Sequence, residues 1–103
     1  MIKVDIAYEG KGIRSLLIKG HANTGDYGKD LVCAGVSACA TGALNALDDD
    51  EGSYDVALEA GRVEIDFHGS ISEHDQTVIE TLIIQLKTIE ASYPNALAIK
   101  ERK

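Results

Sequence analysis

The first eight residues place apolar side chains at every second position. These apolar residues are Ile2, Val4, Ile6 and Tyr8. A period of two predicts a β-strand with one buried face. A turn with two glycines at 9–12 leads to a second apolar run at 13–19. Two strands so closely connected are expected to form a hairpin.

A second pair of strands is predicted in the middle of the chain. Runs at 54–59 and 62–68 flank a short turn that contains Gly61, which is the arrangement of a β-hairpin. A last extended segment at 96–101, with apolar residues on one side, predicts an edge strand.

Two other stretches have the spacing of helices. Residues 31–47 carry an apolar stripe and follow Asp30, which is a good N-cap. The stripe consists of Val32, Val36, Cys39, Ala43 and Leu47. A longer helix is predicted to begin after Ser72, a second N-cap, and to stop before Pro94. Its expected buried face consists of Val78, Ile79, Leu82, Ile83, Gln85, Leu86 and Ile89.

The predicted order is strand, strand, helix, strand, strand, helix and a final edge strand. This order is typical of an α+β domain in which a mainly antiparallel sheet packs against two helices. The chain has 103 residues and is expected to fold as a single domain over 1–103. The small residues of the first helix and the exposed strand edges favour a homodimer.

Composition limits the classes of partner and compartment. The formal net charge is −7 at pH 7, which disfavours direct nucleic-acid binding and favours a basic peptide as partner. No apolar run is long enough to span a membrane, and the charged start does not match a secretory signal. Cys33 and Cys39 are about 9 Å apart along one predicted helix, too far for a disulfide. Two thiols fit a reducing compartment, so a cytoplasmic location is expected.

A glycine-containing loop at 22–29 separates two residues that are suited to catalysis, His21 and Cys33. Long irregular loops in compact domains are usually functional or disordered, and a functional loop that covers a substrate is the interpretation favoured here. The glycines expected to form this substrate-binding loop are Gly20, Gly25 and Gly28.

The spacing between Asp30 and Cys33 suggests how the thiol would be activated. With Asp30 as the N-cap, Cys33 is the third residue of the helix, where unpaired N–H groups and the helix dipole favour a thiolate. His21 is then a candidate base and Cys33 a candidate nucleophile of a thiol hydrolase. Asp30 is interpreted first as the helix cap and second as a group that orients the imidazole. A small buried side chain is the alternative role for Cys33.

Other titratable residues give weaker signals. His68 is on the polar face of its strand and His74 is in the first turn of the second helix, so both are interpreted as solvated. No Cys-x-x-Cys or His-x-x-x-His pair occurs, so no metal and no cofactor is expected. A zinc site of His21, Cys33 and a carboxylate or His68 is a minor alternative. The acidic run at 48–51 is interpreted as a solvated loop, with attraction of a basic substrate as the alternative.

The residues between Gly20 and Ala38 resemble a known family. After Gly20-His21 and six further residues, the chain reads Gly28-Lys29-Asp30-Leu31-Val32-Cys33-Ala34-Gly35-Val36-Ser37-Ala38. This pattern closely resembles that of the bacterial ribosomal-processing cysteine proteases, the Prp family. The length and the element order resemble the family as well. Gly35 and Cys39 depart from the alanine and the aliphatic residue common there, which concerns packing more than chemistry.

The resemblance implies a specific activity. His21 and Cys33 match the catalytic dyad of the family, and Asp30 matches an acidic position beside it. The implied substrate is the basic N-terminal extension of large-subunit ribosomal protein number twenty-seven, cut after an aromatic residue and before a small one during ribosome maturation. The family also implies a homodimer in which the loop at 22–29 closes over the peptide.

A non-catalytic role is the competing hypothesis. The same groove would then only hold a peptide, in a ribosome-assembly or peptide-binding adaptor. The alkylation rates of Cys33 and Cys39 distinguish the two hypotheses, because a thiolate reacts faster than a neutral thiol near neutral pH.

Overall fold

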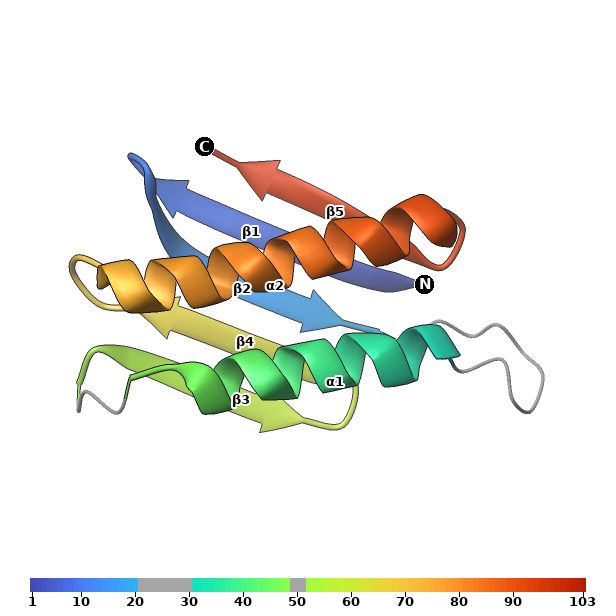
Figure 1. Ribbon diagram of the computed structural model, residues 1–103, viewed down its shortest axis with the longest axis horizontal. Coiled ribbons are helices and arrows are strands. Elements are labelled where there is room, and N and C mark those ends of the chain that lie inside the picture. Colours follow the sequence, from blue (N-terminus) through green and yellow to red (C-terminus); the bar gives the residue numbers. More distant parts are fainter. Residues whose placement is uncertain (21–30, 49–51) are drawn as a thin grey trace.

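The computed structural model describes residues 1–20, 31–48 and 52–103, which form a five-stranded sheet with two helices on one face (Figure 1). The strands are β1 (Ile2–Glu9), β2 (Gly12–Lys19), β3 (Tyr54–Glu59), β4 (Arg62–Phe67) and β5 (Leu97–Arg102). The helices are α1 (Leu31–Ala46) and α2 (Glu73–Ser92). The predicted α+β class and order of elements are confirmed. Neither of these helices combines the length and the apolar character needed to cross a membrane.

The strand order across the sheet is β3-β4-β2-β1-β5. Both predicted hairpins form, and β2 joins them by pairing antiparallel with β4, with Ile18 opposite Val63. After α2 the chain returns to the sheet as β5, which pairs parallel with β1 and forms one edge. The sheet is therefore mainly antiparallel, as predicted, with a single parallel pair among the described strands.

The core lies between the sheet and the helices. On β1 the inward residues Ile2, Val4 and Ile6 are at most 2% exposed. On β2 the run Leu16-Leu17-Ile18 alternates as well, because Leu16 and Ile18 are buried while Leu17 is only half buried. Both helices of the described part of the chain lie on this one face of the sheet (Figure 1).

Helix α1 packs on the sheet through a stripe that differs from the prediction at one position. Val32, Val36, Ala43 and Leu47 are buried as expected. Ala40, not Cys39, completes the stripe, and Cys39 is half buried at the side of the core. The predicted core position of Cys39 was therefore wrong by one residue. Since a helix turns by about 100° per residue, this moves the thiol toward α2.

The buried face of helix α2 also differs from the predicted face at one position. Ile79, Leu82, Ile83 and Leu86 are buried as predicted, but Gln85 is exposed. The prediction for Gln85 was wrong because its helical spacing does not remove the cost of burying an amide without a partner.

The start of α2 is tied to the end of α1 through a buried carboxylate. Ser72 caps α2 as predicted, and its Oγ accepts a hydrogen bond from the backbone N–H of Asp75 at 3.1 Å. Asp75 is only 3% exposed. Its Oδ1 accepts the backbone N–H of Asp48 at 2.9 Å and lies 2.9 Å from Nδ1 of His74. His74 is half exposed and also lies 3.3 Å from the Asp48 carboxylate, so describing it as merely solvated was incomplete.

These contacts of His74 make part of the free energy of unfolding depend on pH. The hydrogen bond to Asp75, assisted by the charge of Asp48 and opposed by partial desolvation, raises the pKa of His74 above its ordinary value of 6.5. A raised pKa in the folded state stabilises the protein below the unfolded pKa, and this contribution is lost as the pH rises through the folded pKa.

We expect His74→Gln to lower the free energy of unfolding at pH 5.5–6 (about one unit below the ordinary histidine pKa) and to change it little at pH about 9. Urea melts across this range measure the difference. A constant difference at all pH values would contradict the ionic role of His74.

Candidate active site

Cys33 is the third residue of α1 and is half buried against the core. Its predicted place in the first turn of the helix is therefore confirmed. The remaining predicted site residues fall elsewhere. Gly20 follows directly after β2, whereas His21, Gly25, Gly28 and Asp30 lie outside the described residues.

The side chain of Cys33 lines a cavity of about 280 Å³ beneath the N-terminal half of α1. Gly20, at the end of β2, lines the same cavity, and so does the turn between β3 and β4. The helix adds two hydroxyl groups, Ser37 and Thr41, and the β3–β4 hairpin adds the charged residues Glu59 and Arg62 to an otherwise apolar lining. An apolar cleft with a few polar groups and a thiol at its wall is the usual form of a small substrate site.

Gly20 holds a conformation that other residues adopt only with strain. Its φ is +95°, and a Cβ at this position would lie 2.6 Å from the carbonyl oxygen of Met1. Its backbone N–H donates to the carbonyl of Gly61 at 2.9 Å. The end of β2 is thus fixed against both the N-terminus and the β3–β4 turn. The sequence suggested a loop glycine, and the structure adds a steric reason for it.

We expect Gly20→Ala to damage both stability and activity. The unfavourable φ and the backbone clash should cost about 2 kcal/mol or more of the free energy of unfolding. A shift of about 1 Å in the chain next to His21 should lower kcat/KM about 10²-fold. Gly10→Ala is the matched control, since Gly10 also has a positive φ, +63°, but open space around its Cβ position. Equal losses in the two variants would show that the clash at Gly20 has no effect.

The two cysteines face different surroundings. Neither forms a disulfide, as predicted from their spacing. Cys33 lines the cavity under α1, whereas Cys39 lines a wider groove of about 810 Å³ between α1 and α2. Both thiols are half buried, so their burial alone does not explain a difference in reactivity.

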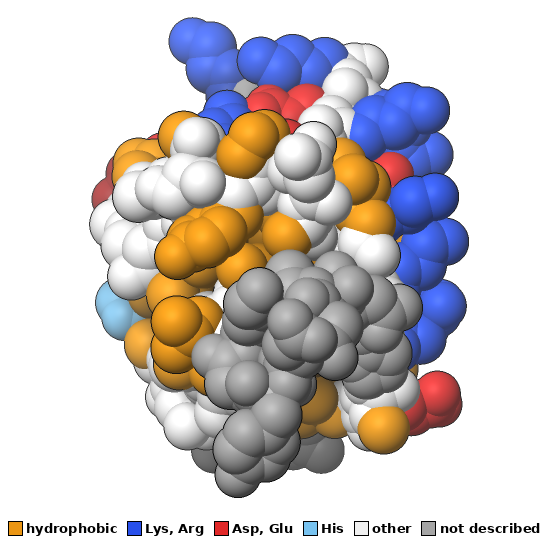
Figure 2. Space-filling model, turned by 90° about the vertical axis from the view of Figure 1, so that its right-hand side faces the viewer, with side chains coloured by type: hydrophobic (Ala, Val, Ile, Leu, Met, Phe, Trp, Pro, Cys, Tyr) orange, Lys and Arg blue, Asp and Glu red, His pale blue; other side chains and the backbone are white. Residues whose placement is uncertain are grey.

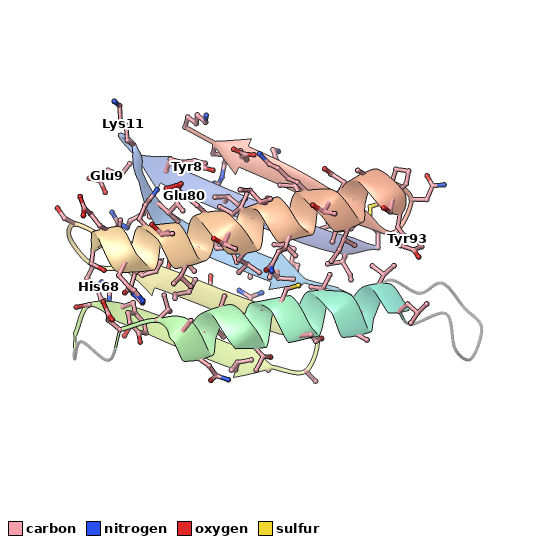
Figure 3. All side chains as sticks on the ribbon, in the orientation of Figure 1. Tyr8, Glu9, Lys11, His68, Glu80 and Tyr93 are labelled. Atoms are coloured by element: carbon pink, nitrogen blue, oxygen red, sulfur yellow. The ribbon has the colours of Figure 1, made fainter. Side chains whose placement is uncertain are left out.

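The two histidines that the structure describes lie far from Cys33. His68 follows β4 at the end of the sheet opposite the N-terminus of α1 (Figure 3). Its Nε2 lies 2.7 Å from the carboxylate of Asp55. It is separated by about 20 Å of strand from Arg62, which lines the Cys33 cavity. A zinc site that joins Cys33 to His68 is therefore excluded.

Among the described residues, ligand atoms suited to a metal gather at one place, formed by Asp48, His74 and Asp75. The Nδ1 of His74 faces both carboxylates, and Asp75 also accepts the N–H of Asp48. These contacts are those of an imidazole nitrogen held between two carboxylates.

Comparison with known proteins decides the family. The sequence profile of the family described as "Cysteine protease Prp" matches residues 1–98. The chain belongs to this family. It is accordingly a cysteine endopeptidase, and the resemblance seen around Gly20 and Cys33 is confirmed at the level of the family.

Individual Prp proteins agree with this assignment. The ribosomal processing cysteine protease Prp of Bacillus subtilis is 38% identical over 96 residues, which cover 86% of each chain. A crystal structure of Prp from S. aureus with a covalently linked product peptide superposes with a TM-score of 0.88 at 30% identity, and covers 99% of this chain and 100% of that one. A second S. aureus structure, with a substrate peptide, has a TM-score of 0.85 at 29% identity, with the same coverage.

One wall of the cavity was not recognised in the sequence. The turn at 58–63 was predicted as a hairpin, but nothing in its residues indicated that it lines the Cys33 cavity. Its place follows from the pairing of β2 with β4, which joins segments more than forty residues apart in the chain. The backbone N–H of Gly20 donates a hydrogen bond to the carbonyl of Gly61. Both glycines are visible in the sequence, but their contact follows only from the register between β2 and β4.

Proposed function

We propose that Cys33 is the nucleophile and His21 the base of this endopeptidase. The observation that carries the proposal is that Cys33 and Gly20, the residue directly before His21, line the same cavity. His68 and His74 belong to other contacts at the far end of the sheet. His21 is therefore the histidine whose place in the chain suits a base for Cys33, with Asp30 as a supporting residue.

The reaction follows the general course of thiol hydrolases. His21 takes the proton from Sγ of Cys33, and the thiolate attacks the scissile carbonyl to give a tetrahedral intermediate. N–H groups of the first turn of α1 suit the stabilisation of both the thiolate and the oxyanion. The intermediate collapses to an acyl-enzyme as the amine leaves with a proton from His21. Water, activated by the same imidazole, then releases the new carboxylate.

The substrate we propose is the N-terminal extension of large-subunit ribosomal protein number twenty-seven, processed in the cytoplasm. The relatives are named ribosomal processing proteases, and the S. aureus protein binds both a substrate peptide and a covalently linked product peptide. The test is incubation with a synthetic peptide from that protein of the same genome, followed by mass spectrometry. A single cut after an aromatic residue supports the proposal, and binding of the peptide without a cut would support the adaptor instead.

Of the acidic run at 48–51, the structure describes Asp48, and its contacts bear on the alternative that this residue attracts a basic substrate. Asp48, the member that the structure describes, follows α1 about 22 Å along the helix from Cys33. Its backbone and carboxylate are used in the tie to α2. Asp48 is therefore placed to join the two helices and not to guide a peptide toward the thiol.

A homodimer is also part of the proposal. The surface formed by α1 and α2 contains the groove of about 810 Å³, which small residues of α1 keep open. Ile84 on α2 is 64% exposed. A second copy of the chain would cover these apolar groups, and sedimentation velocity at several protein concentrations tests this by the measured mass.

A further inference from the structure

The face of the sheet that carries no helix has a charge pattern of its own. Successive side chains of a strand point to opposite faces, and Ile2, Ile18 and Val63 point toward the helices. Lys3, Lys19 and Arg62, each next to one of these residues, therefore lie on the open face. The register places Lys3 opposite Lys19 and Lys19 opposite Arg62. Three cations thus form a row across three neighbouring strands.

Strand β5 extends this row into a patch. Lys100 and Arg102 alternate with the inward residues of β5 and pair in register with Asp5 and Ala7 of β1. Arg62 already lies 3.4 Å from the carboxylate of Glu64, so we call the other four cations, Lys3, Lys19, Lys100 and Arg102, the basic patch. Figure 2 shows Lys and Arg side chains in a band along the side of the molecule formed by the sheet. The face also holds carboxylates: Asp5 and Glu9 lie on β1, where Glu9 pairs with Arg14, and the others lie on the β3–β4 side, at Asp55, Glu59, Glu64 and Asp66.

Fold stability does not explain Lys3 and Lys19, the two members of the basic patch on interior strands. Like charges directly opposite each other on a sheet are destabilising, by up to about 1 kcal/mol per pair. Lysines often protect edge strands from aggregation, which can account for Lys100 on the edge strand β5. It cannot account for Lys3 and Lys19, because β1 and β2 are interior strands. The chain also has 17 acidic and 10 basic residues, so an acidic residue opposite Lys3 or Lys19 would have been the commoner outcome. In the described part of the chain, neither lysine has an ion-pair partner within 4.0 Å.

We propose that the basic patch binds the phosphate backbone of single-stranded RNA. The patch covers β5, β1 and β2, which span about 10 Å at the usual strand spacing. A strip this narrow fits one chain of phosphates, whereas a membrane or a folded acidic protein would also meet the carboxylates on β3 and β4. The net charge of −7 opposes general binding to nucleic acid, so the interaction is confined to this strip.

The patch is placed beside the cleavage site. Lys19 is followed directly by Gly20, which lines the Cys33 cavity. RNA on the patch would bring a ribosomal protein that is already bound to RNA close to Cys33. This role rests on the proposed function, but binding of RNA to the patch does not.

The experiment is fluorescence anisotropy of a labelled oligouridylate about 20 nucleotides long. If the four cations of the patch neutralise four phosphates, raising the salt from about 50 to about 200 mM should weaken wild-type binding about 50-fold. For Lys3→Gln/Lys19→Gln the same change should weaken binding only about sevenfold, because about two phosphate contacts remain. The single variants should each lower the slope of log K against log salt by about 0.7.

Lys11→Gln is the matched control. Lys11 lies in the β1–β2 turn, at the end of the molecule opposite the N-terminus of α1 (Figure 3). Lys11 carries the same charge as Lys19, and its replacement should leave the slope of log K against log salt unchanged.

Equal effects of Lys11→Gln and Lys19→Gln, or no binding at all, would overturn the proposal. Tighter binding of polyglutamate through the same lysines would overturn it in favour of an acidic peptide. Cleavage of a short peptide free of RNA should be the same in all these variants, so a failure of the proposed protease function would be seen separately.

Discussion

Replacement of Cys33 by alanine is expected to lower kcat/KM for peptide cleavage by about 10⁴-fold or more. No covalent intermediate can form without the thiol, and the cavity alone would only bind the peptide. Because Cys33 is half buried, the free energy of unfolding should change by only about 1 kcal/mol or less. The measurement is initial-rate cleavage of the ribosomal-protein peptide, together with urea unfolding of both proteins.

Cys39→Ala is the control for this change, since Cys39 is equally half buried in the same helix but lines the groove on the α2 side. It should keep wild-type activity within about twofold. Iodoacetamide should label Cys33 faster than Cys39, because Cys33 lies in the first turn of α1 and is the proposed nucleophile. Wild-type cleavage by Cys33→Ala would end the assignment of the nucleophile. Equal and slow labelling of both thiols would favour the non-catalytic adaptor.

Replacement of His21 by alanine is expected to lower kcat/KM by about 10³-fold while the protein remains folded. General-base catalysis needs a group that can take the proton of the thiol, and His68 and His74 are engaged at the other end of the sheet. Added imidazole should restore part of the lost activity in a concentration-dependent way. Such rescue is not expected for a variant that has simply lost its fold.

His68→Ala serves as the control for His21→Ala. It removes an imidazole that pairs with Asp55 on the surface, and it should leave kcat/KM unchanged. If His68→Ala were as inactive as His21→Ala, or if His21→Ala kept full activity, the base would have to be assigned elsewhere.

The elements that could be predicted from sequence are those set by neighbouring residues. The alternation at Ile2, Val4 and Ile6 and the turns after them predict the hairpins, because a strand period and a tight turn are local properties. The first-turn position of Cys33 followed in the same way from the start of α1. The site residues His21 and Asp30 were suggested by motif spacing alone, and their roles remain predictions.

Other features depend on contacts between distant segments, and local patterns do not contain them. The pairing of β2 with β4, which brings Gly61 to Gly20, could not be predicted from either hairpin. The buried position of Asp75 was also missed, since an aspartate near a helix start is usually an exposed cap residue. Cys39 and Gln85 were misplaced because a helical stripe read from sequence is uncertain by about one residue in rotation.

The bond between Gly20 and Gly61 also bears on when the enzyme becomes active during its own synthesis. Cys33 and the proposed base His21 both belong to the first half of the chain. The β3–β4 hairpin that completes the Cys33 cavity is made later and joins β2 only through non-local pairing. Contacts of large sequence separation form late and slowly in folding. A growing chain would therefore carry both proposed catalytic residues before the Cys33 cavity is complete, and we expect it to cleave peptides only after the second hairpin has joined the sheet.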